Sequence, residues 1–214
     1  MNTEALISLL ARGPVEADLR TTPRRISLAT AAGLLLAVGA MWSVMGPRPD
    51  IASAAAIPMF WLKFLVPLGL AAAFFVACSR LSRPGDRAGG AWKAVTMMLA
   101  VLWAAAAISL WAAPTAQRAS MVEGTSSWSC VGSIALLAMP LFVCVLLAIR
   151  GLAPTRPTWA GAAAGGLAGS VAALVYAVHC NEMTLPFVAV WYMLGIATPA
   201  VLGSVIGPKL LRWT

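Results

Sequence analysis

Charged side chains are scarce in this 214-residue chain, and histidine occurs only once. Charged residues make up 10% of the sequence and hydrophobic residues 61%, with a mean hydropathy of +0.87. Soluble domains contain roughly a quarter charged residues and about half apolar ones. The scarcity of charge therefore excludes an ordinary soluble domain and indicates a membrane protein.

Acidic side chains and catalytic motifs are also few. The seven acidic residues fall mostly in predicted loops, so no nucleophile, base and acid can be assembled into an active site. The sequence contains neither Cys-x-x-Cys nor His-Glu-x-x-His, which excludes a standard redox motif and a zincin site. We therefore predict that the chain is not an enzyme.

Apart from Lys93 at the inner end of its span, charge within the predicted spans is limited to Lys63. Ion-coupled transporters usually carry acidic groups at mid-membrane, and the predicted spans have none there. Lys63 lies near the outer end of its span. Long basic side chains at such positions extend their charged group to the membrane surface, and we expect Lys63 to do the same.

Six apolar runs are each long enough to cross roughly 30 Å of hydrocarbon as helices. They are too long, and alternate too little, for the strands of a membrane barrel. The sequence predicts an all-α polytopic membrane protein with six transmembrane helices. We expect a tail over 1–25 and a bundle over 26–214, with spans at 26–45, 56–78, 91–113, 131–149, 159–179 and 186–208.

Most of the 15 basic residues flank the spans on one side of the predicted membrane. By the positive-inside rule this side is cytoplasmic, so both termini are predicted to be cytoplasmic. The residues form no continuous basic stripe, which argues against direct nucleic-acid binding. They are Arg12, Arg20, Arg24, Arg25, Arg80, Arg83, Arg87, Lys93, Arg150, Arg156, Lys209 and Arg212.

The N-terminal tail contains a short amphipathic pattern. Its apolar face is formed by Leu6, Ile7, Leu9 and Leu10, and a helix there would end at the glycine and proline that follow. Two interpretations remain open. The segment either lies on the membrane surface or is a docking helix for a cytoplasmic partner.

Glycines recur at four-residue spacing in the fifth span, at Gly161, Gly165 and Gly169. Small residues at this spacing let helix backbones approach closely in lipid. We expect these glycines to pack within the bundle rather than in a dimer.

Two of the four cysteines lie at predicted outer helix ends. Counted from the basic residues at the inner ends, Cys130 and Cys180 have depths that agree to about one helical turn. They form a structural disulfide, a thiol pair that oxidises or binds a soft metal, or two unrelated thiols. We interpret Cys78 and Cys144 as small buried apolar residues.

Cys180 lies among other metal-ligand types, in the stretch YAVHCNEM. His179 and Met183 are borderline and soft ligands, while Glu182 is a hard carboxylate. The set suits copper or zinc better than magnesium or calcium. Adjacent residues on a helix point about 100° apart, so His179 and Cys180 would need a distorted helix end to share one ion.

The ordered motifs GPRPDI, FWLKF, RLSRPG, SWSCVGSIALLAMPLFV, LAPTRPTWAGAAAGGLAGSVAALVYAVHC and LPFVAVWYMLG extend over nearly the whole chain. This pattern resembles the NrsF-type membrane anti-sigma factors of proteobacteria. The resemblance implies a multi-pass inner-membrane protein that sequesters an extracytoplasmic-function sigma factor through its cytoplasmic side. It also implies that Cys130 and Cys180 sense heavy metals or oxidative stress.

The resemblance implies the lipid bilayer and a sigma factor as partners, without an obligatory cofactor. Copper or another soft metal ion would then be a signal rather than a resident group. The residues alone leave other functions open. The alternatives are a small metal-related membrane transporter and a membrane thiol oxidoreductase.

Overall fold

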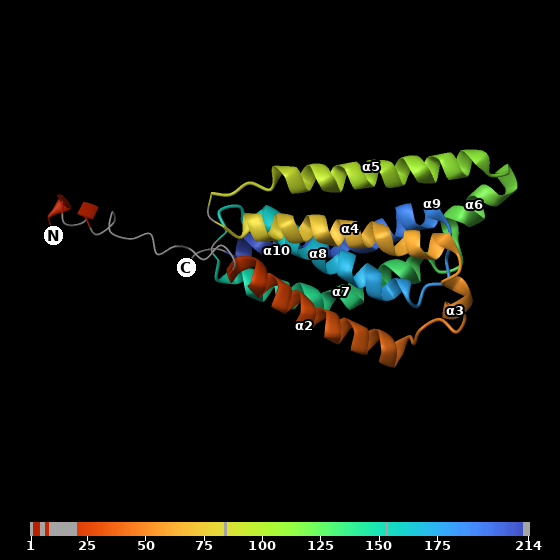
Figure 1. Ribbon diagram of the computed structural model, residues 1–214, viewed down its shortest axis with the longest axis horizontal. Coiled ribbons are helices and arrows are strands. Elements are labelled where there is room, and N and C mark those ends of the chain that lie inside the picture. Colours follow the sequence, from red (N-terminus) through yellow and green to blue (C-terminus); the bar gives the residue numbers. More distant parts are fainter. Residues whose placement is uncertain (1, 5–6, 9–20, 84, 153, 212–214) are drawn as a thin grey trace.

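The computed structural model describes residues 2–4, 7–8, 21–83, 85–152 and 154–211. All regular secondary structure in these ranges is helical (Figure 1). The predicted all-α fold class is therefore confirmed.

Six segments of the described chain are long and apolar enough to cross a membrane, as predicted. A 24-residue helix rises about 36 Å, which exceeds the hydrocarbon thickness. The six segments are α2 (Thr21–Val44), α4 (Pro58–Leu81), α5 (Gly89–Ala112), α7 (Ser127–Arg150) with α6 (Thr115–Glu123) before it, α8 (Pro157–Ala177), and the run of α9 (Leu185–Phe187), π-helical η1 (Val188–Tyr192) and α10 (Met193–Leu210).

Several helices extend beyond the apolar runs that predicted them. Helix α2 begins at Thr21 rather than at 26, and α4 continues to Leu81 rather than ending at 78. Apolar runs mark the lipid-covered part of a helix, whereas backbone hydrogen bonds can continue into the polar interface. Helix α2 therefore begins within the last residues of the predicted tail.

The two ends of the bundle differ in their connections (Figure 1). Helix α2 begins and α10 ends at the same end, where the α4–α5 and α7–α8 connections also lie. The basic residues of the described chain that were assigned to the inner side belong to this end. At the opposite end lie the short helices α3 (Ile51–Ala54), α6 and α9. We refer to this second end as the outer end.

Helix α8 lies at the centre of the bundle and is almost completely covered by α10, α4 and α7. A Cβ at Gly161 would overlap the carbonyl oxygen of Gly203, and one at Gly165 would overlap that of Pro199. A Cβ at Gly169 would lie 2.9 Å from the Cα of Ile196. The three glycines thus lie against α10 of the same chain, where the two backbones approach closely.

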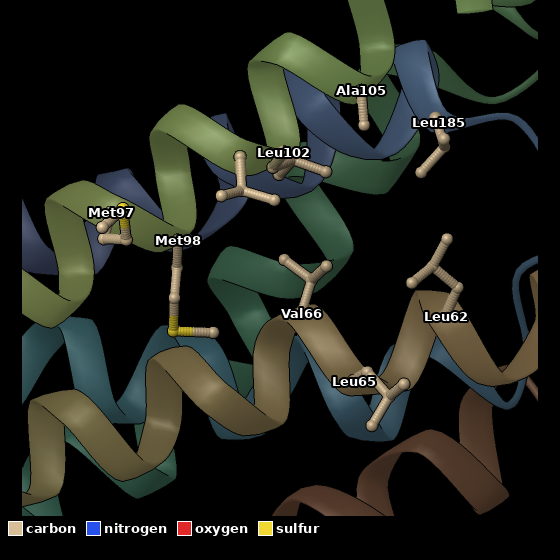
Figure 2. Close-up of a pocket in the computed structure, with 9 residues that line it drawn as sticks. Leu62, Leu65, Val66, Met97, Met98, Leu102, Ala105 and Leu185 are labelled. Atoms are coloured by element: carbon tan, nitrogen blue, oxygen red, sulfur yellow. The ribbon is translucent and has the colours of Figure 1, made fainter.

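Helix α5 lies at the edge of the bundle, against α4 and α9. A cavity of about 280 Å³ separates parts of α4 and α5. Figure 2 shows Met98 extending from α5 toward α4, while Leu62 and Val66 extend from α4 into the same gap. The lining is apolar, so α5 is attached by side-chain packing rather than by hydrogen bonds across this gap.

The outer end contains more structure than the sequence predicted. The segment between the predicted spans that end at 113 and begin at 131 forms α6 and the start of α7, and a π-helical turn precedes α10. Helix α6 is polar and has no buried residue, which explains why apolar patterning did not reveal it. A π-helical turn depends on the tertiary surroundings of its residues, and π-turns often occur at functional sites.

Candidate functional site

Cys130 and Cys180 both lie at the outer end of the bundle. Cys130 lies in the first turn of α7, and its amide donates to the Ser126 carbonyl at 2.8 Å. The sequence placed Cys180 at the end of a helix, but α8 ends at Ala177 and Cys180 lies in the turn that follows. Both cysteines are buried, with 0% and 2% exposure, and both are free thiols.

The two thiols lie within electrostatic reach of each other and are enclosed by two tyrosines. Tyr176 of α8 interacts with Cys130. Tyr192, in the π-helical turn, faces Cys180, and the two tyrosine rings are 6.0 Å apart between centroids. The buried Tyr192 hydroxyl faces the thiol without a hydrogen bond of ordinary geometry. Both thiols are therefore buried beside tyrosine side chains, in a region that we call the thiol compartment.

Lys63 is buried in this compartment and does not extend to the membrane surface, so the prediction for its side chain was wrong. Its side chain is fully buried, and Nζ donates to the carbonyl oxygens of Cys180 at 2.5 Å and Glu182 at 3.1 Å. The turn that follows α8 covers the outer end of α4 and supplies these acceptors. The ammonium is thus satisfied beneath the protein surface.

A second basic residue reaches the same turn. Arg48, with 7% exposure, forms a two-pronged salt bridge with Asp50 at 2.8 and 2.7 Å. Its third nitrogen lies 3.5 Å from the Cys180 carbonyl oxygen, at the long limit of a hydrogen bond. The Arg48 amide also donates to Val178 at 3.2 Å. The α2–α3 connection is therefore fastened to the turn that carries Cys180.

Ionisation of Arg48 and Asp50 is mutually favoured. Hydrogen bonding from Arg48 holds the pKa of Asp50 below its ordinary value of 3.8, despite some desolvation. The same hydrogen bonding raises the pKa of Arg48. Both residues lie in the connection after α2, outside the spans, so the pair remains charged at neutral pH.

The three neighbours of Cys180 proposed as metal ligands have different surroundings. His179 Nδ1 pairs with the Gly46 carbonyl oxygen at 2.8 Å, and a Glu182 oxygen accepts from Thr125 N and Oγ1 at 2.7 and 2.8 Å. Met183 is partly buried. Within the described chain, no three His, Cys, Asp or Glu side chains are grouped to hold a metal ion.

The turn after Cys180 is also tied to the segment before Cys130. Thr184 Oγ1 donates to Met121 and Trp191 Nε1 to Val122, both at 2.7 Å. Together with Glu182 and Thr125, these bonds connect the end of α6 to the start of α9. The two cysteines thus belong to two segments that are directly cross-braced.

Sequence reasoning missed Lys63, Arg48 and the two tyrosines as neighbours of the thiols. One signal was available in the sequence, because a lone lysine in an apolar run needs an explanation.

The other residues that the sequence analysis singled out lie apart from this site. Ile7 is exposed, Cys78 is buried, and Cys144 is partly buried within α7. Leu6, Leu9 and Leu10 lie outside the described residues.

Known proteins resemble this chain over its full length. The sequence pattern of the NrsF family, described as negative regulator of sigma F, matches residues 10–213. A protein of Azospira oryzae named "Probable anti-sigma-F factor NrsF" is 40% identical over 213 residues, covering 100% of both chains. The "Anti-sigma-F factor NrsF" of Caulobacter vibrioides is 35% identical over 214 residues, also covering 100% of both. The chain matches no solved structure.

Proposed function

The chain belongs to the NrsF family of negative regulators of sigma F, and on this premise we propose that it is a membrane anti-sigma factor controlled by its outer thiol pair. It holds an extracytoplasmic-function sigma factor at the bacterial inner membrane and releases it when Cys130 and Cys180 react. The observation that carries the proposal is the burial of these two free thiols within electrostatic reach of each other.

The proposed orientation places both termini in the cytoplasm. Its support is the concentration of basic residues at the end where α2 begins and α10 ends, because cytoplasmic connections carry excess lysine and arginine. The thiol pair then lies on the outer side of the inner membrane. In that compartment thiols meet oxidants and metal ions that the cytoplasm excludes.

The proposed sigma-docking element is the apolar face of the N-terminal tail, formed by Leu6, Ile7, Leu9 and Leu10. The exposure of Ile7 is consistent with this role. A short apolar helix face docks into a groove of its partner. The basic inner end of the bundle would add electrostatic attraction to acidic surfaces of a sigma factor.

Two chemical signals suit the pair. A peroxide-class oxidant would form a sulfur–sulfur bond. Two electrons would pass from the two sulfurs to the O–O bond of the oxidant, which breaks. The two thiol protons would end in the reduced product, which is water when the oxidant is hydrogen peroxide. A soft metal ion such as copper would instead displace the thiol protons and form metal–sulfur bonds. His179 and Met183 are candidate additional ligands, and His179 would first have to leave Gly46.

The thiol role is tested with a reporter gene transcribed by the released sigma factor. Cys130→Ser and Cys180→Ser should abolish induction by added copper or peroxide while repression without signal is retained. Cys144→Ser, on the same helix as Cys130, is the matched control and should respond normally. Induction of both outer variants at the level of the parent protein would contradict the proposal. Separate copper and peroxide treatments distinguish the two signals.

The docking role is tested by removing residues 2–13 from the full-length protein. This deletion should abolish co-purification of the sigma factor from solubilised membranes and should make the reporter constitutive. Leu6→Asp with Leu10→Asp is the more conservative variant, because it changes only the apolar face. Sigma binding that survives both changes would remove the tail from the proposed mechanism.

A further inference from the structure

Lys63 carries a buried charge that no acidic side chain of the described residues pairs with. Its side chain is fully buried, and no ion pair between described residues involves Lys63. Buried ammonium groups are expensive unless hydrogen bonds or opposite charges compensate for lost hydration. The groups that replace the lost hydration of the Lys63 ammonium therefore help to fix the position of the outer end of α4.

The compensation comes from the turn that carries the sensor thiol. Lys63 Nζ donates to the main-chain carbonyls of Cys180 and Glu182, and the thiols of Cys130 and Cys180 lie within its electrostatic reach. The Tyr192 ring centroid is 6.0 Å from Nζ. Every one of these groups belongs to the thiol compartment, so Lys63 links the outer end of α4 to that compartment by hydrogen bonds, in addition to the packing of α4 against α8.

We infer that Lys63 is the positioning residue that couples the thiol pair to α4. Its ammonium holds the Cys180 and Glu182 carbonyls through two hydrogen bonds, and these bonds break when the pair reacts. This inference rests on the proposed function, because it assigns Lys63 to the same sensing site. This pair of hydrogen bonds has two effects. It fixes the turn in which Cys180 faces Cys130, and it ties the state of that turn to α4.

The coupling follows from the position of the acceptor. One carbonyl that binds Lys63 belongs to Cys180 itself, so a movement of the Cys180 backbone moves the acceptor with it. A disulfide requires sulfurs about 2.05 Å apart, and a shared metal ion imposes its own ligand geometry. Either product pulls on the backbone of Cys180. A buried ammonium that loses its acceptors must then move, together with the helix that carries it.

The first measurement uses only the thiols and does not involve sigma factor. In membranes containing the full chain with Cys78→Ser and Cys144→Ser, diamide oxidises the Cys130–Cys180 pair by accepting two electrons and two protons. Lys63→Met should slow disulfide formation by roughly tenfold, the scale of one charge-assisted hydrogen bond. The matched control is Arg118→Met, which also removes an outer cation bonded to two carbonyls, those of Trp111 and Ala113.

The second measurement is the response of the sigma-dependent reporter. Lys63→Met should retain repression and raise the signal concentration for half-maximal induction by roughly tenfold. Arg118→Met should leave both values unchanged, and Lys63→Arg, which keeps charge and donors, should restore much of the response. If Lys63→Met does not accumulate in membranes, Lys63→Gln replaces it, because the amide keeps donors without charge.

Three results separate the outcomes. Disulfide formation and induction in Lys63→Met that match Arg118→Met would overturn the inference. Slow disulfide formation in both variants would also overturn it, because the effect would then reflect outer charge in general. Normal induction in the Cys130 and Cys180 serine variants would defeat the proposed function instead, while the diamide measurement would still decide whether Lys63 positions the pair.

Discussion

The ammonium nitrogen of Lys63 lies 2.5 Å from the carbonyl oxygen of Cys180, although the two residues are 117 positions apart in the chain. This contact joins the outer end of α4 to the turn after α8. Together with Arg48, it places a cation beside a buried thiol pair and two tyrosines. The same turn also receives bonds from the α2–α3 connection and supplies Glu182 to the α6–α7 connection. Four segments of the chain therefore meet at Cys180.

The close approach of α8 and α10 predicts that Gly165 tolerates no larger residue. Gly165→Ala should lower stability by about 1–3 kcal/mol, because the new methyl group would overlap the carbonyl oxygen of Pro199. Gly132→Ala on α7 is the control, since a Cβ there meets nothing within 4 Å. Thermal unfolding in detergent measures both. A normal unfolding temperature for Gly165→Ala would show that the two helices are not packed backbone to backbone.

Glu182 is predicted to hold the α6–α7 connection in place. Glu182→Ala removes the acceptor for Thr125 N and Oγ1, so exchange of the Thr125 amide hydrogen should accelerate by roughly tenfold. Glu123→Ala removes a carboxylate from the end of α6 and serves as the control. Hydrogen exchange with mass spectrometry reads this segment directly. Equal exchange in the two variants would mean that Glu182 does not brace the connection.

The Arg48–Asp50 pair predicts a pH dependence in the α2–α3 connection. The folded pKa of Asp50 lies below 3.8, so its stabilising contribution is complete above that ordinary value. It declines as the pH falls below 3.8 and is lost once the pH passes the folded pKa. Protease resistance of the connection should therefore be higher than in Asp50→Asn at neutral pH, and the difference should disappear in acid.

A control is available for this pH effect at the other end of the molecule. Asp86→Asn changes an aspartate that accepts from the neighbouring Arg87 amide in the α4–α5 connection. It should leave cleavage of the α2–α3 connection unchanged at every pH. A difference between parent and Asp50→Asn that persists unchanged in acid would exclude the ion pair as its cause.

The proposed orientation predicts which connections can be labelled from outside. In a cysteine-free background, Gln117→Cys on α6 should react with a membrane-impermeant maleimide in intact spheroplasts. Asp86→Cys, in the α4–α5 connection, should react only after the membrane is opened. The reverse pattern would place the basic end outside and the thiol pair in the cytoplasm, and the sensing proposal would lose its oxidising compartment.

The sequence predicted the features that depend on composition along one helix. Apolar runs located the six spans. Counting residues from Arg150 and Arg156 placed Cys130 and Cys180 at one depth, and in the structure the two thiols lie within electrostatic reach of each other. These predictions needed only the helical rise and the cost of charge in lipid.

The surroundings of the thiols could not be predicted in the same way. Whether Lys63 reaches the surface or is buried depends on what covers the end of α4, and that cover comes from a turn more than a hundred residues away. Helix α8 ends at Ala177, although the apolar run continues to 179, and the turn therefore starts within the predicted span. The pairing of His179 with Gly46 is likewise a contact between distant segments. Such contacts leave no periodic pattern in the sequence.

The central position of α8 has a consequence for how the protein enters the membrane. Its alanines and glycines suit contact with α10 and α4, and they make α8 the least apolar of the six candidate spans. Lipid alone would retain this helix less strongly than its neighbours, since insertion energy depends on side-chain hydrophobicity. During synthesis α8 emerges after α2, α4 and α7, which provide much of the protein surface that covers it. Its stable insertion therefore depends on the earlier helices, and α10 completes its enclosure last.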